Sequence, residues 1–350
     1  MATPLSTIVY LDGRFTTATE AKVSLLDRAY LFGDSAFDTL RAYQGVPFRL
    51  AQHIDRLLHS AQVLGITLTQ SSEELAELAQ ETVRRTALDD AYLRITLSRG
   101  EGGRGISPVD CANPVLSIIA RPLSRYPAEV YQAGIRSMTV HARRVPAACL
   151  DPSIKCGNYL PNIVARRELD ALGMIEGVQL SVDGAVVCGT VSNLFVVRDG
   201  GLLTPDLGSG CLPGVTRAAI LELAREIGLK CTETMLHPVD LAAADEMFFC
   251  NTLMECLPVA ELDGRLFTRA PGQVTRQVQA ELRKLVERET RRAVGVRGRR
   301  QPAVDDAGTE KVGGQADQEE TGGGVLSESA PRSPGKRGSP FREATRGSHE

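Results

Sequence analysis

The sequence predicts a mixed α/β fold of two domains followed by a tail, and three observations lead to this description. Segments with the alternating pattern of strands are separated by segments with the periodicity of helices. The 350 residues are 43% hydrophobic, which is enough to bury a large core and to form two domains. After Glu289 the composition shifts to Gly, Arg, Glu, Ser and Pro, and we expect residues 290–350 to form a disordered tail.

The first quarter of the chain predicts a hairpin followed by two helices. Asp12 and Gly13 lie between apolar stretches and suit a two-residue hairpin turn. Apolar residues recur at helical spacing over 50–66, and this helix would present His53 and Arg56 together on another face. A second helix is predicted from Ser71, because serines that can cap it precede glutamates.

The rest of the ordered part alternates strands with helices. In the strand predicted over 91–99 apolar and polar residues alternate, so Tyr92 and Arg94 share one face. Further strands are predicted within 134–145, 177–182, 193–205 and 246–252, and helices over 158–173 and 216–229 separate them.

Charge and composition exclude several kinds of partner. The net charge of -3 and the isoelectric point near 6.1 leave no basic excess for nucleic acid or an anionic membrane. No stretch is long and apolar enough for a membrane span, and we expect a cytoplasmic protein that acts on small molecules. The eight cysteines occur singly and the five histidines lack ligand spacing, so no metal site is predicted.

Two positions suggest chemistry, although each has an ordinary structural alternative. Lys155 lies between a strand-rich segment and a helix start, where a lysine is commonly a solvated surface charge. Gly214 precedes a helix that begins near Thr216, and exposed backbone N–H groups at such a helix start can bind a phosphate. A Pro-Gly turn with no ligand is the alternative there.

Several stretches of the chain follow one another in the order of a known enzyme family. They are YLDGRF, DRAYLFGDSAFDTLRAY, HIDRLLHSA, SRGEGGRG, IKCGNYLPN, GTVSNLFVV, LPGVTR and NTLMECLPVAELDG. Through them the chain resembles the fold-type IV pyridoxal 5'-phosphate (PLP) enzymes, the class IV aminotransferases and their lyase relatives. The resemblance covers most of the first 270 residues. It implies a homodimer, and domains at 1–123 and 124–289 with the cofactor in the cleft between them.

The resemblance also implies roles for individual residues. Lys155 would form the internal aldimine with PLP and then move the proton at the substrate α-carbon. Arg56 would contact the phosphate, Leu212 would pack against the ring, and Tyr159 would hydrogen-bond the phenolic oxygen. The remaining cofactor contacts would be Cys188, Ser192, Asn193, Gly214, the amides of Val215 and Thr216, and the hydroxyl of Thr252.

Four residues are implied at the substrate side of the site. Tyr92 and Arg94 reproduce the pattern by which branched-chain members bind carboxylate groups. Arg99 matches a carboxylate-binding arginine of the D-amino-acid members, and Phe37 would form part of the pocket wall. Arg94 at a solvent-facing sheet edge and Phe37 in an ordinary core are the structural alternatives.

Cys188 departs from the family pattern. The segment before Ser192 and Asn193 normally carries a glutamate whose carboxylate pairs with the protonated pyridine nitrogen, and here that position holds a thiol. A thiol is a weak acceptor and stays mostly uncharged near neutral pH. We therefore expect a ring nitrogen that is often neutral and a slow carbanion step.

Three functions are compatible with these observations. An aminotransferase that moves an amino group between an amino acid and a 2-oxo acid is favoured by the lysine segment and by Tyr92 with Arg94. An aminodeoxychorismate-type lyase that releases pyruvate is suggested by SRGEGGRG and CNTLM. A catalytically impaired relative is suggested by Cys188.

Overall fold

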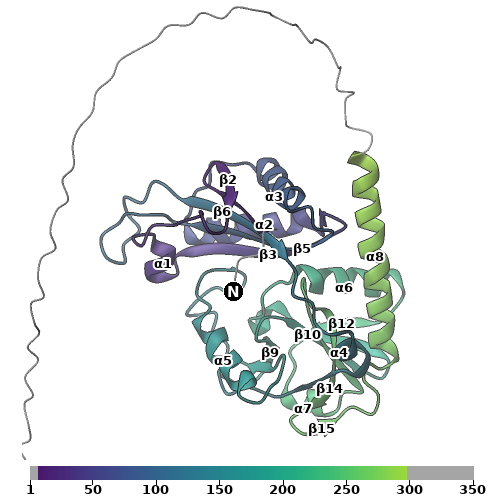
Figure 1. Cartoon of the computed structure of the whole chain (residues 1–350). Coiled ribbons are helices and arrows are strands. Elements are labelled where there is room, and N and C mark those ends of the chain that lie inside the picture. The colour runs from purple at the N-terminus through teal and green to yellow at the C-terminus, as the bar shows by residue number, and fades with distance from the viewer. Residues whose placement is uncertain (1–6, 298–350) are drawn as a thin grey trace, which may run out of the picture. The chain divides into compact units, whose positions relative to one another are not determined.

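A computed structural model describes residues 7–297, and two β-sheets organise them (Figure 1). The first sheet is antiparallel throughout, with strand order β2-β1-β6-β5-β3-β4. Its strands are β1 (Ile8–Leu11), β2 (Arg14–Thr17), β3 (Ser35–Tyr43), β4 (Val46–Pro47), β5 (Asp90–Ser98) and β6 (Val115–Pro122). The short helix α1 (Arg28–Phe32) immediately precedes β3.

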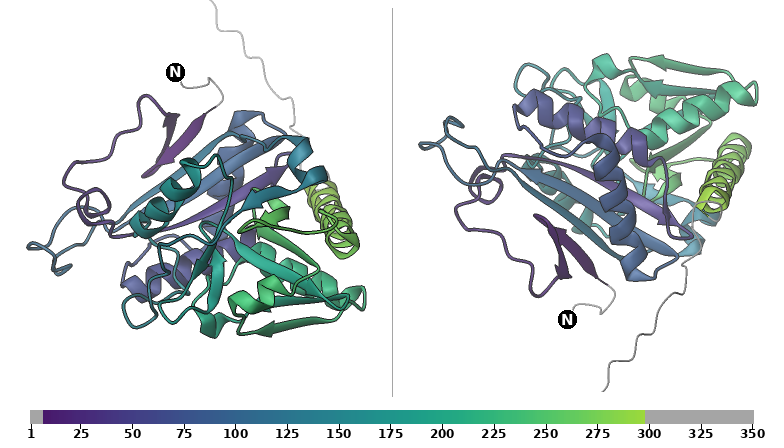
Figure 2. Two further views of the ribbon diagram at one scale, coloured as in Figure 1. Left: turned by 90° about the horizontal axis from the view of Figure 1, so that it is seen from below. Right: turned by 90° about the horizontal axis from the view of Figure 1, so that it is seen from above.

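Two helices cover one face of this sheet, as the view from above shows (Figure 2). They are α2 (Leu50–Leu64) and α3 (Ser72–Thr86), both predicted from periodicity. Ser71 caps α3 through a capping box with Glu74, as the sequence predicts. Asp12 and Gly13 have positive φ angles and form the tight turn between β1 and β2.

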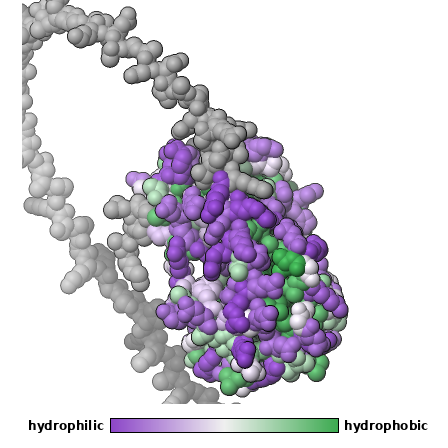
Figure 3. Space-filling model, turned by 90° about the vertical axis from the view of Figure 1, so that its right-hand side faces the viewer, coloured by the Kyte–Doolittle hydropathy of each residue, from purple (hydrophilic) through white to green (hydrophobic). Residues whose placement is uncertain are grey.

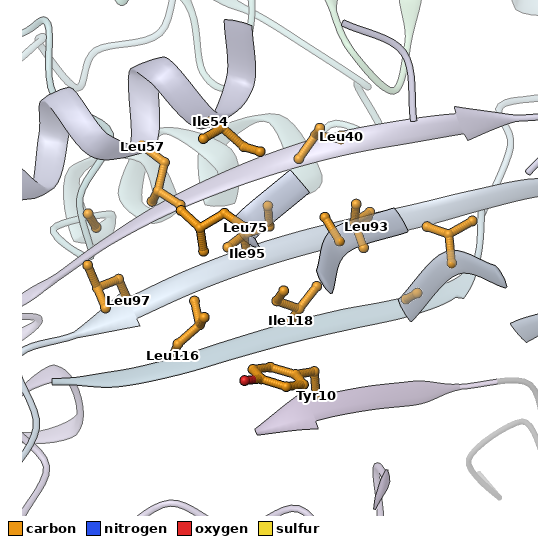
Figure 4. Close-up of a cluster of buried hydrophobic side chains, with 14 of the residues drawn as sticks. Tyr10, Leu40, Ile54, Leu57, Leu75, Leu93, Ile95, Leu97, Leu116 and Ile118 are labelled. Carbon is orange, nitrogen blue, oxygen red and sulfur yellow. The ribbon is translucent and has the colours of Figure 1, made fainter. Parts of the chain in front are cut away.

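The core between helices and sheet follows the alternation of β5. Leu93, Ile95 and Leu97 are fully buried against Leu40 of β3 and Leu57 of α2 (Figure 4). The opposite side chains of β5 are therefore directed away from α2 and α3, toward the second half of the chain. The predicted alternation is confirmed, and it leaves one sheet face to form a site.

The second sheet contains seven strands, with order β12-β11-β10-β13-β14-β15 and with β7 beside β14. The strands are β7 (Ile135–Ser137), β10 (Asn193–Arg198), β11 (Gly201–Pro205), β12 (Cys231–Thr234), β13 (Glu246–Asn251), β14 (Glu255–Leu262) and β15 (Arg265–Leu266). A separate pair joins β8 (Val178–Leu180) and β9 (Val186–Gly189). The first sheet ends at Pro122, next to the predicted domain boundary at 123.

Helices pack around the second sheet and connect its strands. They are α4 (Ala128–Ala133), α5 (Leu160–Asp170), the 3-10 turn η1 (Leu207–Ser209), α6 (Val215–Glu226), α7 (Pro238–Ala242) and α8 (Gln273–Arg297). Buried residues of α6 and α8 form a common core with β10 and β13. The face that carries α8 is largely hydrophilic, with a band of hydrophobic residues along one side (Figure 3).

Helix α8 corrects the predicted start of the C-terminal tail. The compositional shift placed this start after Glu289, but the helix continues to Arg297. Thr290 is buried and donates a hydrogen bond to the Val286 carbonyl, so the helix packs on the body beyond that point. The prediction of disorder for the rest of the tail lies outside the described residues. Within residues 7–297, no helix is both long and apolar enough to cross a membrane.

Candidate active site

A cavity of about 320 Å³ lies where the free face of the first sheet meets the strand ends and loops of the second half. Its walls contain all but one of the site residues predicted from sequence. These are Phe37, Arg56, Tyr92, Arg94, Lys155, Tyr159, Cys188, Ser192, Asn193, Leu212, Gly214, Val215, Thr216 and Thr252.

Lys155 is held in this cavity by its backbone and by its amine. Its N–H donates to the Ser60 hydroxyl of α2, and its carbonyl accepts from the Phe37 N–H of β3, each at 2.9 Å. The amine nitrogen is 2.6 Å from the Tyr159 hydroxyl and 4.6 Å from the centre of the Phe37 ring. The amine therefore faces aromatic groups inside the cavity instead of lying free in solvent.

Arg56 is positioned by a buried carboxylate that the sequence analysis missed. The Asp38 side chain of β3 is fully buried and accepts from Arg56 Nε at 2.8 Å and Nη2 at 2.9 Å. Burial alone would raise the pKa of Asp38, but Arg56 and His53 outweigh it and lower that pKa well below its usual range. Burial lowers the pKa of His53, so a neutral imidazole donates from Nδ1 to Asp38 at 2.8 Å.

The N-terminus of α6 provides backbone donors beside Arg56. No side chain caps this helix, and the Pro213 carbonyl just before it accepts from Arg56 Nη1 at 3.0 Å. A Cβ atom on Gly214 would lie 2.0 Å from Asn193 Oδ1, so the close approach of these residues requires glycine. Asn193 in turn donates to the Leu212 carbonyl. The amides and the guanidinium are groups that can bind an anion.

A second missed carboxylate, Glu176, fixes the adjacent loop. It is fully buried, and its two oxygens accept from the backbone N–H groups of Gly177, Thr190 and Val191 and from the hydroxyls of Thr190 and Ser192. The Asn251 amide donates to the Val191 carbonyl and so connects this loop to the turn that carries Thr252. The loop and the turn thus form one hydrogen-bonded wall of the cavity.

Arg94 and Tyr92 project from β5 into the cavity, next to residues of β3. The strand register pairs Arg94 with Thr39 and Thr96 with Phe37, which places the polar face of β5 beside the Phe37 ring. The Arg94 guanidinium lies 3.7 Å from the centre of that ring, and its Nε donates to the Thr96 hydroxyl. Within residues 7–297, Arg94 forms no ion pair. Its remaining N–H groups can therefore bind a carboxylate.

Arg99 is the predicted site residue that the structure does not bring into the cavity. Its Nε donates to Asp34 at 2.7 Å, and its two Nη atoms donate to the carbonyls of Leu64 and Gly65. Asp34 also binds Arg28, whose other nitrogens donate to carbonyls of the loop over 102–107. Arg99 thus forms part of a structural cluster, and the residues of this chain give no support to a substrate contact.

The charges along the cavity favour anions. Arg56, Arg94, Arg144 and Lys155 line it, whereas Asp151 is the one carboxylate among the described lining residues. Asp151 is exposed, and its side chain accepts from the Ser153 N–H. In residues 7–297, no group of three or more His, Cys, Asp or Glu side chains could hold a metal ion.

The missed residues gave weak signals in the sequence. Asp38 follows Phe37 within a strand, and its position opposite His53 and Arg56 depends on how α2 folds back over β3. Glu176 precedes a glycine and a short strand, a context shared by many surface glutamates. Arg144 stands in a run of two arginines that spacing assigns to no site.

Comparisons with known proteins fit this geometry. The family described as Amino-transferase class IV matches residues 35–262. The branched-chain-amino-acid aminotransferase of Escherichia coli K12 is 33% identical over 286 residues, which cover 80% of this chain and 93% of that protein. A branched-chain aminotransferase from Thermoproteus uzoniensis with norvaline has a TM-score of 0.75 and 34% identity, covering 80% of this chain and 94% of that one.

A third similar protein was solved with a cofactor derivative. This branched-chain amino acid aminotransferase, from the organism abbreviated T.th., is complexed with N-(5'-phosphopyridoxyl)-L-glutamate and has a TM-score of 0.75 and 30% identity. The match covers 80% of this chain and 93% of that one.

Proposed function

The chain belongs to the amino-transferase class IV family, and on this premise we propose that it is a PLP-dependent aminotransferase. It would move an amino group between an L-amino acid with an apolar side chain and a 2-oxo acid. The observation that carries the proposal is that one cavity contains the Lys155 amine, Arg56 and the uncapped N-terminus of α6. These three groups suit an aldehyde that bears a phosphate, because the amine can hold the aldehyde and the guanidinium and backbone N–H groups can bind the phosphate.

The residues at the two ends of the cavity fit PLP. A phosphate dianion would be bound by Arg56, by the amides of Val215 and Thr216, and by the Thr252 hydroxyl. Lys155 would hold the aldehyde carbon covalently, and Tyr159, which already touches the amine, would bind the phenolic oxygen. The volume of about 320 Å³ lies within the usual range for small-molecule sites.

The chain's own groups would handle the proton. When bound, PLP supplies an electron-withdrawing ring that makes the substrate α-hydrogen acidic. The free Lys155 amine would accept this proton and return it, and Tyr159 would hold the amine in position through their 2.6 Å contact. The surrounding wall of Glu176, Thr190 and Ser192 would keep the site rigid during the transfer.

The substrate side of the cavity favours a monocarboxylate with an aliphatic side chain. Arg94 carries a half-buried guanidinium with free N–H groups for the α-carboxylate, and the Tyr92 hydroxyl lines the same wall. Phe37, Leu150 and Leu253 add apolar surface nearby. Branched-chain amino acids suit this combination as donors. The L form and 2-oxoglutarate as the acceptor are proposed because a similar enzyme was solved with N-(5'-phosphopyridoxyl)-L-glutamate, which shows that such a site can also take a second carboxylate.

A labelling and activity experiment tests the proposal. The full chain is loaded with PLP, reduced with borohydride and digested, and we expect the phosphopyridoxyl group on the Lys155 peptide. Lys155→Ala should lose this label, whereas Lys230→Ala, an exposed lysine, should keep it. L-valine, L-leucine and L-isoleucine should transfer their amino groups to 2-oxoglutarate, and D-alanine should not.

Two results would refute this assignment. Attachment of PLP elsewhere would remove the role of Lys155. Pyruvate release from aminodeoxychorismate without an oxo-acid acceptor, together with no transfer from any amino acid, would identify a lyase.

We further infer that the enzyme is a homodimer in the cytoplasm. The segment from Val23 to Phe32 exposes several large apolar side chains, and so does the first part of α5 with Leu160 and Ile163. Gly33 at the end of α1 lies against Gly157, so the two apolar surfaces adjoin. Contiguous exposed apolar surface of this kind is typical of a protein interface. The unpaired cysteines suit a reducing compartment.

The same inference extends to domain organisation. The halves 1–123 and 124–297 would act as two domains, because each contains its own sheet and core. PLP would bind in the cleft between them.

A further inference from the structure

We propose that this chain keeps the pyridine nitrogen of its bound cofactor unprotonated, through Cys188 and the nearby Arg144. The inference rests on the proposed function, because it concerns the cofactor that Lys155 would hold. It goes further by assigning the protonation state of the cofactor's ring nitrogen. An unprotonated ring withdraws fewer electrons from the substrate than a pyridinium does.

The first support is that the cavity offers no carboxylate to a ring nitrogen. Asp151 is the one carboxylate among the described lining residues, and it is an exposed loop residue that binds the backbone at Ser153. The aldehyde and the nitrogen occupy opposite ends of a pyridine ring, so the nitrogen would point away from Lys155. Cys188 lines the cavity at the position where the family pattern has a glutamate.

The second support is the state of the Cys188 thiol. Its side chain is 5% exposed, and its sulfur lies 4.0 Å from Oε1 of Gln179 on the neighbouring strand β8, to which the S–H can donate. Burial raises the pKa of this thiol to about 12, so it carries no charge near neutral pH. A neutral thiol cannot stabilise a pyridinium as a carboxylate does.

The buried carboxylate that acts on Cys188 cannot replace the missing one. Glu176 influences Cys188 electrostatically, but both of its oxygens are already occupied by hydrogen bonds from the loop over 190–192. Turning toward the ring would leave those buried N–H groups without partners, which is unfavourable. Glu176 is therefore a structural anchor of the loop.

The third support is a cation on the same wall. Arg144 is half-buried and lines the cavity, and its Nε donates to the Gly210 carbonyl at 3.4 Å. Among the described residues it pairs with no carboxylate, and its charge acts electrostatically on the Cys188 thiol. The other neighbour of that thiol, Cys211, is a buried thiol as well. A positive charge beside a pyridine nitrogen disfavours its protonation.

Nuclear magnetic resonance on the loaded enzyme tests the inference directly. The full chain is reconstituted with PLP labelled with ¹⁵N in the ring, and the ¹⁵N chemical shift is measured from pH 6 to pH 8, roughly the neutral range in which a carboxylate is charged. We expect the shift of an unprotonated pyridine throughout. A pyridinium shift in the unmodified protein would overturn the inference.

Variants of position 188 provide the matched comparison. Cys188→Glu should move the ¹⁵N signal to the pyridinium position, whereas Cys188→Ser, of similar size and also uncharged, should leave it unchanged. If Cys188→Glu does not fold, Cys188→Asp places a shorter carboxylate at the same cavity-lining position and should cause the same movement. An unmoved signal in a folded, loaded carboxylate variant would count against the role of Cys188.

The outcome can be separated from failure of the proposed function. Borohydride labelling of Lys155 reports whether the cofactor is bound at all. A protein that labels at Lys155 and gives a pyridinium signal keeps its proposed function and loses this inference. A protein that does not label loses both.

Discussion

Arg94 shows how one side chain can set substrate recognition. Its guanidinium stacks on the Phe37 ring and uses one nitrogen on Thr96, so its orientation is fixed while other N–H groups stay free. Such a preorganised fork binds a carboxylate with two parallel hydrogen bonds. Arg99 lies only five residues away, but its Nε donates to Asp34 and its two Nη atoms donate to two backbone carbonyls. Two arginines five residues apart therefore differ in what they can still bind, because their partners within the chain differ.

We predict that Arg94→Gln weakens substrate binding more than it slows turnover. Loss of a charge-assisted hydrogen bond costs about 1.5–3 kcal/mol, which corresponds to roughly a 10- to 150-fold rise in KM for the amino acid. Steady-state kinetics with L-leucine measure this rise. Arg84→Gln is the control, because Arg84 is an exposed residue of α3 that pairs only with Glu81. An unchanged KM in Arg94→Gln would exclude Arg94 from carboxylate binding.

At the scale of elements, the link between α2 and β3 positions the anion site. Asp38 of β3 binds both His53 and Arg56 of α2, so one buried carboxylate holds the helix on the strand. The same contact orients Arg56 toward the Pro213 carbonyl at the start of α6. Asp38 therefore both packs α2 against β3 and orients Arg56.

We predict that Asp38→Asn destabilises the fold by about 3–5 kcal/mol, because it leaves the buried Arg56 without its charge partner. The pKa of Asp38 is lowered in the folded protein, so the unfolded chain binds protons more readily. The stability that Asp38 contributes is complete above its unfolded pKa of about 3.9 and is lost as the pH falls below that value. Urea denaturation at several pH values measures both effects.

A matched control lies on the same helix. Asp55 is exposed on α2, and Asp55→Asn should change the free energy of unfolding by less than about 0.5 kcal/mol. The difference in stability between the unmodified protein and Asp38→Asn should shrink in acid. A constant difference down to pH 3, below roughly the unfolded pKa, would contradict the proposed ionisation of Asp38.

At the scale of the whole molecule, exposed apolar side chains occur on α1, on the loop after β5 and at the start of α5. Leu31 and Phe32 of α1 are about half exposed, at 49% and 50%, and Leu160 of α5 is 68% exposed. Ile106 and Val109 of the loop after β5 are exposed as well. A soluble monomer rarely presents so many large apolar residues on neighbouring segments. The proposed dimer would bury them.

We predict that the purified protein has twice the 37.7 kDa chain mass in light-scattering measurements. Leu31→Asp should weaken the dimer, raising its dissociation constant by at least about tenfold, since it forces a charge into an apolar contact. Leu266→Asp is the control, because Leu266 is also exposed but lies on β15, far along the chain from α1. A monomeric unmodified protein would contradict the proposed interface.

The sequence by itself determined the local structure of this protein. Periodicity predicted α2, α3 and β5 with their buried faces, and the Asp12–Gly13 turn predicted the first hairpin. Composition placed the end of the body near Glu289, whereas α8 continues to Arg297 and its Thr290 is still buried. These features depend on neighbours along the chain, which a sequence displays directly.

Only the tertiary structure decided which distant groups meet. Asp38 with Arg56 and Glu176 with the loop over 190–192 are contacts between residues far apart in sequence. Arg144 and Cys188, also distant in sequence, line the same cavity. Arg99 matched a family position, yet the fold directs it to Asp34 and away from the cavity. Burial and hydrogen bonding arise when elements pack together, and no local pattern encodes them.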